Sequence, residues 1–231
     1  MKLLIVSTSK IYGSGYMEYL LDELKEFYKD TDEILFIPYA RPSGISHDEY
    51  TEYPKKAFAK IGKTVKGIHE FEDPKKALEE STGIFTGGGN SFVLLKTLYD
   101  LGLMEVLKKV IKSGTPYMGS SAGSNITGMS IGTSNDMPIV YPPSFITMGC
   151  IPFNINAHYL DPIIGSTHKG ETRETRIKEF HVFNDIAVLG LREGSWLEVL
   201  GDDIILKGDF TARWFEKDKE AKELEVGKMD L

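Results

Sequence analysis

Short apolar runs alternate with amphipathic stretches through the first half of the chain, and this alternation is the feature that most limits the possible folds. Residues 3–6 form a continuous apolar run, which is typical of a strand buried on both faces. Apolar side chains then recur at helical spacing through residues 17–28. Further apolar runs at residues 34–37 and 83–86 precede other helical stretches. The rhythm predicts a mostly parallel sheet with helices on both faces.

The last third of the chain has a different pattern. Its short strand-like runs are separated by Gly or Asp-Asp turns and lie at residues 187–191, 196–200, 204–206 and 212–215. This spacing favours an antiparallel C-terminal extension. The tail from Glu216 is charged and predicts a solvated surface segment. Because no internal repeat or linker interrupts the pattern, we expect residues 1–231 to form a single α/β domain.

Three elements between these regions are less regular. Residues 65–71 alternate weakly and predict a strand. Pro54 is expected to start or to kink a helix that reaches Ile61. A further helix is predicted at about residues 171–183.

Composition excludes several classes of function. The chain has 27 basic and 34 acidic residues and a net charge of −7, so it has no electrostatic reason to bind nucleic acid or an anionic membrane. It has one cysteine, Cys150, which excludes an intrachain disulfide and fits a reducing, cytoplasmic location. No apolar run resembles a signal peptide or a membrane span.

The segment Gly119-Ser120-Ser121-Ala122-Gly123 matches the G-x-S-x-G pattern of a nucleophile elbow. Such an elbow places a nucleophile on a sharp turn between a strand and a helix, where small neighbours permit a strained backbone. Here an apolar pair precedes the segment and a helix-compatible stretch follows it. We therefore expect Ser121 to be a nucleophile and the Ala122 N–H to be an oxyanion donor.

A second glycine-rich loop, Gly87-Gly88-Gly89-Asn90, also lies between a predicted strand and a predicted helix. Its backbone can approach a ligand closely, so Gly88 or Gly89 is expected to supply a second oxyanion N–H. A phosphate site is the main alternative. The loop lacks the Lys-Ser/Thr of a P-loop and the spacing of G-x-G-x-x-G, which favours the oxyanion role.

A serine nucleophile needs a general base, which is usually a histidine oriented by a carboxylate. Of the five histidines, His158 ends an alternating run at residues 153–157, and catalytic residues of α/β sheets collect at strand ends. His69 and His181 fit structural roles better, and His168 has Lys169 beside it, which opposes protonation of the imidazole.

Two carboxylates are candidates for orienting His158. Asp136 lies between Ser121 and His158 in the sequence, and Glu193 follows an apolar strand. The sequence does not show which of these two carboxylates orients His158. No grouping has metal-ligand spacing and nothing indicates a cofactor, so we expect neither a metal nor a cofactor.

Several motifs together resemble the peptidase E family of bacterial α-aspartyl dipeptidases. They are Gly-Ser-Ser-Ala-Gly-Ser-Asn from Gly119, Ser-Asn-Asp-Met-Pro-Ile-Val from Ser134, Ile-Asn-Ala-His ending at His158, and His-Lys-Gly-Glu-Thr-Arg ending at Arg173. The Gly-Gly-Gly-Asn loop and Ile-Pro-Tyr-Ala at residues 37–40 fit the family as well. The resemblance extends from the first strand to about Trp214. One departure is Ser120, where the family often has an aromatic residue.

This resemblance implies a serine peptidase on a fold similar to class I glutamine amidotransferases, acting on dipeptides and some short peptides with N-terminal aspartate. It implies that Ser121 is the nucleophile, His158 the base and Gly88 an oxyanion donor, and it leaves both Asp136 and Glu193 open. Only the resemblance gives Arg173 a role, as the residue that receives the substrate's aspartate side chain.

The expected partner is therefore a small peptide, and a monomer or homodimer is expected. Other interpretations are an esterase of the α/β-hydrolase type, a cyanophycinase-like peptidase, and a catalytically inactive binding protein. The esterase is disfavoured because the chain lacks an H-G-G-G oxyanion motif.

Overall fold

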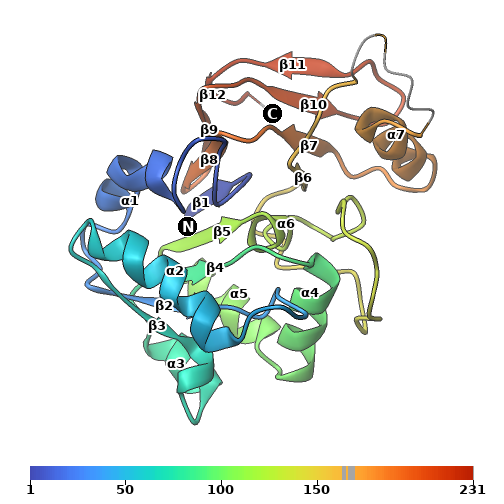
Figure 1. The fold of residues 1–231 in the computed structure, drawn as a ribbon. Helices are drawn as coiled ribbons and strands as arrows, with labels where there is room; N and C mark the ends of the chain where they lie inside the picture. The colour runs from blue at the N-terminus through green and yellow to red at the C-terminus, as the bar shows by residue number, and fades with distance from the viewer. Residues whose placement is uncertain (163–164, 166–169, 231) are drawn as a thin grey trace.

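The strands of the chain are divided between two sheets (Figure 1). A computed structural model describes residues 1–162, 165 and 170–230. The larger sheet has eight strands and the smaller has four. Within the described residues, no helix combines the length and the apolar character that crossing a membrane requires.

Five neighbouring strands of the larger sheet are parallel, and three antiparallel strands extend it at one edge. In spatial order the parallel strands are β3 (Thr64–Gly67), β2 (Glu33–Ile37), β4 (Ile84–Thr86), β5 (Tyr117–Ser120) and β1 (Lys2–Val6). The antiparallel strands are β8 (Ser195–Leu200), β9 (Asp203–Gly208) and β12 (Gly227–Lys228). The predicted mostly parallel α/β fold is confirmed.

The smaller sheet was not predicted. Its strands, in spatial order, are β11 (Lys222–Leu224), β10 (Ala212–Phe215), β7 (Val188–Leu191) and β6 (Asn154–Ala157). Strands β6 and β7 are parallel and the other neighbours are antiparallel. The C-terminal strands therefore do not form one extension, because they are shared between the two sheets. The tail from Glu216 is not only a solvated segment, since it contributes β11 to one sheet and β12 to the other.

Helices cover both faces of the larger sheet, as the apolar run of β1 predicted. Leu3 and Ile5 pack into one buried apolar cluster, and the alternating Leu4 and Val6 pack into another on the opposite face. The helices with members in the first cluster are α3 (Pro74–Glu80), α4 (Ser91–Asp100), α5 (Met104–Lys112) and α6 (Ala122–Asn125). The second cluster includes α1 (Leu21–Phe27), which follows the short helix η1 (Glu18–Leu20), and α2 (His47–Ala59).

Three predicted elements differ in their bounds. Helix α2 begins before Pro54 because Ser46 and Glu49 form a reciprocal capping box at its start. The expected strand at residues 65–71 ends at Gly67, and the short helix η2 (Ile68–Glu70) follows it. Helix α7 (Arg173–Phe183) starts two residues later than predicted, where the Thr172 hydroxyl accepts a hydrogen bond from the Thr175 N–H at 3.0 Å.

Candidate active site

Ser121 lies on a sharp turn between β5 and α6. Its backbone has φ 53° and ψ −108°, a conformation that non-glycine residues rarely adopt. The glycines on either side permit this turn. A Cβ on Gly119 would lie 2.2 Å from the carbonyl oxygen of Gly123, and a Cβ on Gly123 would lie 2.2 Å from that of Thr86. The local sequence therefore dictates a tight elbow with a strained serine at its tip.

The side chains of Ser121, His158 and Glu193 form a continuous hydrogen-bonded chain. The Oγ of Ser121 lies 2.8 Å from Nε2 of His158, and Nδ1 of His158 lies 2.6 Å from Oε1 of Glu193. With Nδ1–H donating to the carboxylate, Nε2 can accept the serine proton. These hydrogen-bonded side chains are open to solvent, because the His158 side chain is 38% exposed and that of Glu193 is 48% exposed.

His158 is held by its backbone as well as by its side chain. Its φ is 55°, in the left-handed region. Its N–H donates to the Oγ of Ser7 at 3.0 Å, and this hydroxyl donates to the carbonyl oxygen of Leu191 at 2.7 Å. Ser7 follows β1, His158 follows β6 and Leu191 ends β7, so the two hydrogen bonds join the ends of three strands from both sheets.

The glycine-rich loop passes directly against the nucleophile. A Cβ on Gly88 would lie 3.1 Å from the Cβ of Ser121, so a side chain at this position would crowd the nucleophile. The Tyr50 hydroxyl donates to the carbonyl oxygen of Gly88 at 2.9 Å and fixes the orientation of the loop. Gly88 and the N–H of Ala122, at the start of α6, are thus both adjacent to Ser121. An oxyanion formed at Ser121 can be stabilised by backbone N–H groups from both elements.

The two candidate carboxylates have different surroundings. Glu193 contacts His158, whereas Asp136 accepts hydrogen bonds from the Ser91 N–H at 2.7 Å and from the Ser134 hydroxyl at 3.0 Å. Among the described residues, no hydrogen bond or ion pair joins Asp136 to His158. Asp136 instead lies at the start of α4, where a carboxylate stabilises the positive end of the helix dipole.

Arg173 is the first residue of α7 and is half-buried. Burial and the neighbouring Arg176 lower the pKa of its guanidinium, and the Asp136 carboxylate opposes this shift. Arg173 and Asp136 therefore lie close enough to interact. In the described part of the chain, no carboxylate lies within ion-pair distance of Arg173, so the guanidinium can accept an anionic group.

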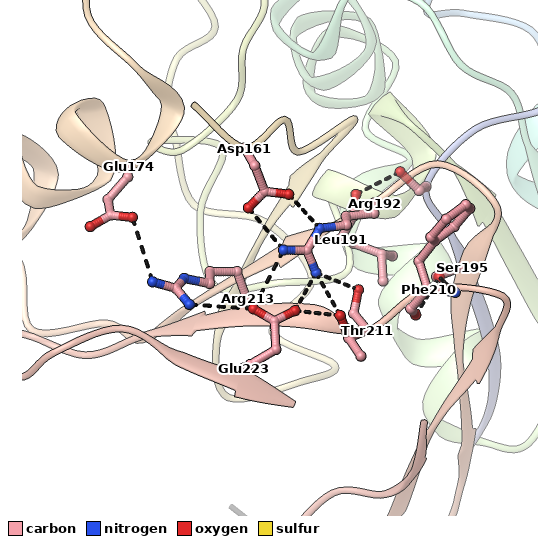
Figure 2. Close-up of polar contacts among 10 residues, drawn as sticks. Asp161, Glu174, Leu191, Arg192, Ser195, Phe210, Thr211, Arg213 and Glu223 are labelled. Atoms are coloured by element: carbon pink, nitrogen blue, oxygen red, sulfur yellow. Dashed lines mark hydrogen bonds and ion pairs between the residues drawn. The ribbon is translucent and has the colours of Figure 1, made fainter. Parts of the chain in front are cut away.

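A network of charged side chains includes residues close in sequence to the site residues, and the sequence analysis missed it. Figure 2 shows Arg192 between Asp161 and Glu223, with Arg213 extending the network to Glu174. Arg192 binds Asp161 through two parallel hydrogen bonds, Nε–Oδ2 at 2.8 Å and Nη2–Oδ1 at 2.9 Å.

Three members of this network lie close in sequence to site residues. Arg192 precedes Glu193, Asp161 comes three residues after His158, and Glu174 follows Arg173. The network thus ties the three segments that carry the site. Its individual charges are unremarkable in the sequence, which is why only their spatial arrangement reveals them.

The remaining histidines have other partners. Nε2 of His69 lies 2.8 Å from Oδ1 of Asp48, and Nε2 of buried His181 lies 3.0 Å from the carbonyl oxygen of Ile186. His168 lies outside the described residues. Across residues 1–162, 165 and 170–230, no group of three or more His, Cys, Asp or Glu side chains could hold a metal ion.

The sequence is similar to those of known peptidases. The family model "Peptidase family S51" matches residues 3–207. Peptidase E of Streptomyces coelicolor is 51% identical over 227 residues, covering 98% of this chain and 92% of the relative. A probable alpha-aspartyl dipeptidase of Drosophila melanogaster is 45% identical and covers 96% of this chain and 92% of its own length.

Solved structures share the fold. A putative peptidase E from Listeria monocytogenes superposes with a TM-score of 0.68 at 22% identity, covering 90% of this chain and 98% of that chain. This TM-score shows that the two chains share the same arrangement of strands and helices.

Proposed function

The chain belongs to peptidase family S51, and on that premise we propose that it is a dipeptidase that cleaves dipeptides and some short peptides with N-terminal aspartate through an acyl-enzyme on Ser121. The observation that carries this proposal is the continuous chain from Ser121 through His158 to Glu193, at 2.8 and 2.6 Å. These distances are within the range required for proton transfer between a nucleophile and its base.

The proposed reaction has two halves. In the first, Nε2 of His158 takes the Ser121 proton as Oγ attacks the carbonyl carbon of the aspartyl residue. The N–H groups of Ala122 and Gly88 stabilise the resulting oxyanion. The C–N bond then breaks, His158 protonates the leaving amine, and an acyl-enzyme ester remains on Ser121.

In the second half, water replaces the amine. His158 removes a proton from water as the water oxygen attacks the ester carbonyl, and the Ser121 oxygen leaves with the proton that His158 returns. Glu193 holds the imidazole in the tautomer that these steps require and stabilises its protonated form. Asp136 does not contact the imidazole; by binding the Ser91 N–H it supports the glycine-rich loop.

Arg173 is the proposed determinant of substrate choice. A guanidinium can bind the aspartate side chain through two parallel N–H···O bonds, and its partly desolvated position strengthens such an ion pair. Because Arg173 is only half-buried, removing it should cost about 2 kcal/mol, the lower end for truncated ion pairs. That loss corresponds to roughly 30-fold in kcat/KM.

The test compares Ser121→Ala and Arg173→Ala on Asp-Leu and Ala-Leu. Ser121→Ala should abolish hydrolysis of Asp-Leu, and Arg173→Ala should reduce it while leaving Ala-Leu unaffected. Ser120→Ala is the matched control, because it removes a neighbouring hydroxyl that is buried away from solvent. Full activity in Ser121→Ala would show that the nucleophile is assigned wrongly.

The same assay separates the alternative interpretations. An esterase would prefer a short-chain p-nitrophenyl ester to Asp-Leu, a cyanophycinase-like peptidase would prefer an aspartyl-arginine polymer, and an inactive binding protein would cleave none of them. A cytoplasmic location and a monomeric or homodimeric state remain predictions from the sequence.

A further inference from the structure

A pocket of about 520 Å³ lies next to the proposed active site and has no role in the mechanism above. It lies between the segment that follows β1 and the segment that joins β2 to α2. The side chains that matter for its chemistry are Ser9, Lys10, Tyr16, Arg41, Tyr50 and Tyr53. Aromatic and cationic groups together are suited to bind an organic anion.

Two connections place this pocket beside the reacting groups. Tyr50 lines the pocket, and its hydroxyl holds the carbonyl oxygen of Gly88, the residue that packs against Ser121. Ser9, on another wall, comes two residues after Ser7, whose hydroxyl accepts the N–H of His158. The pocket thus adjoins both the oxyanion loop and the segment that anchors the base.

The charge of the pocket is positive, although the chain as a whole carries −7. Lys10 and Arg41 both line it, and none of its lining residues is Asp or Glu. In the described part of the chain, neither cation lies within ion-pair distance of a carboxylate. The Arg41 guanidinium stacks 4.9 Å from the centroid of the Tyr50 ring, which limits its freedom before any ligand arrives.

A buried donor also lines the pocket. The Tyr16 hydroxyl is inaccessible to solvent and has no hydrogen-bond partner among the described residues. Burial and the neighbouring Tyr50 raise the pKa of Tyr16 well above its ordinary value, so its proton stays on the oxygen.

The pocket and Arg173 belong to elements that lie on opposite sides of α6 in Figure 1. In Figure 1, α6 lies between α1 and α2 on one side and α7 on the other. The pocket borders α2, and Arg173 begins α7. If the aspartate side chain of a dipeptide binds Arg173 as proposed, the second residue can extend past Ser121 toward the pocket. In a dipeptide the free carboxylate belongs to that second residue, whose Cα lies only about 3.8 Å from that of the aspartate.

We propose that Lys10 and Arg41 bind the C-terminal carboxylate of the dipeptide substrate, while the tyrosine rings of the pocket contact the side chain of the leaving residue. This assignment rests on the proposed function and deepens it. It makes the enzyme selective at both ends of the substrate, because Arg173 selects the acidic first residue and the pocket selects a free carboxylate one residue further on. Longer or amidated peptides would lose the second contact.

The test measures kcat and KM for Asp-Leu and for Asp-Leu-amide, which lacks the terminal negative charge. The variants are Arg41→Met and Lys10→Met, which keep a long apolar side chain and remove the charge. Lys56→Met is the matched control, because Lys56 is an exposed lysine on α2 that does not line the pocket. Thermal melts verify that each variant folds.

The expected results are specific. The unaltered enzyme should prefer Asp-Leu to Asp-Leu-amide by about tenfold or more in kcat/KM, which corresponds to one well-formed ion pair. Arg41→Met and Lys10→Met should reduce or abolish this preference, chiefly by raising KM for Asp-Leu, and should leave the amide within about twofold. Lys56→Met should keep the preference.

Three results would overturn the assignment. If the enzyme cleaves both substrates equally well, or if the variants lose the same factor on both, the pocket does not bind the carboxylate, while the proposed aspartyl peptidase activity stands. If the unaltered enzyme cleaves neither substrate, the proposed function fails and this assignment fails with it.

Discussion

Replacing Glu193 by glutamine removes a negative charge from the imidazole of His158 while keeping the size of the side chain. The Nδ1–Oε1 distance of 2.6 Å places the centres of the two charges about 4 Å apart once the imidazole is protonated. At that separation the attraction is about 1 kcal/mol in bulk water and about 4 kcal/mol at a protein surface. Because both side chains are more than one third exposed, the effect should lie between these limits. The expected loss in kcat is therefore about 5-fold to 1000-fold.

The assay is steady-state hydrolysis of Asp-Leu at neutral pH, with Asp136→Asn measured beside Glu193→Gln. Asp136 has its hydrogen bonds to Ser91 and Ser134 and none to His158 among the described residues, so its variant should lose less kcat. A larger loss of kcat in Asp136→Asn than in Glu193→Gln would refute the reasoning, because the carboxylate that contacts the base would not be the one that supports it.

Three further predictions concern other parts of the molecule. Hydrogen bonds from Arg192 lower the pKa of the Asp161 carboxyl in the folded protein. These bonds therefore stabilise the fold fully above the unfolded pKa of an aspartate, near 4, and their contribution is lost as pH falls through the lower folded pKa. Urea denaturation should show a smaller loss of stability between neutral and acidic pH in Asp161→Asn than in the unaltered protein. Burial raises the pKa of the Cys150 thiol to about 11, so Ellman's reagent should react with it only after unfolding, and rapid reaction of the native protein would contradict this burial. Gly89→Ala would place a Cβ 2.2 Å from a neighbouring carbonyl oxygen and should lower Tm by more than Gly13→Ala, whose site also has a positive φ but no atom within 4 Å; equal shifts would show that backbone conformation alone sets the cost.

The larger sheet could be predicted because the residues of its strands are apolar where the strands are buried. The run from Leu3 to Val6 is apolar at every position, as expected for a strand that is covered on both faces. The helical spacing of the apolar residues that follow indicates a helix that covers one of these faces. The smaller sheet could not be predicted. Strand β11 (Lys222–Leu224) is mostly polar, and its pairing with β10 depends on backbone hydrogen bonds that leave no pattern in the side chains.

The candidate site likewise has residues that could be predicted from the sequence and residues that could not. Ser121 is identified by its immediate neighbours, because the steric demands of the turn are local. The choice between Asp136 and Glu193 depends on contacts between residues far apart in the chain, which periodicity cannot describe. The capping box at Ser46 is a different case, since its Ser-x-x-Glu spacing was present in the sequence and predicts the start of α2.

The elbow serine follows a strand of the eight-stranded sheet, whereas the imidazole that meets it follows a strand of the four-stranded sheet. Catalytic activity therefore requires that the four-stranded sheet stay packed against the eight-stranded sheet. A partly denatured molecule that keeps its large layer intact but lets the small layer separate should retain most of its helical circular dichroism and yet be inert, so inactivation should precede the loss of secondary structure as denaturant is added.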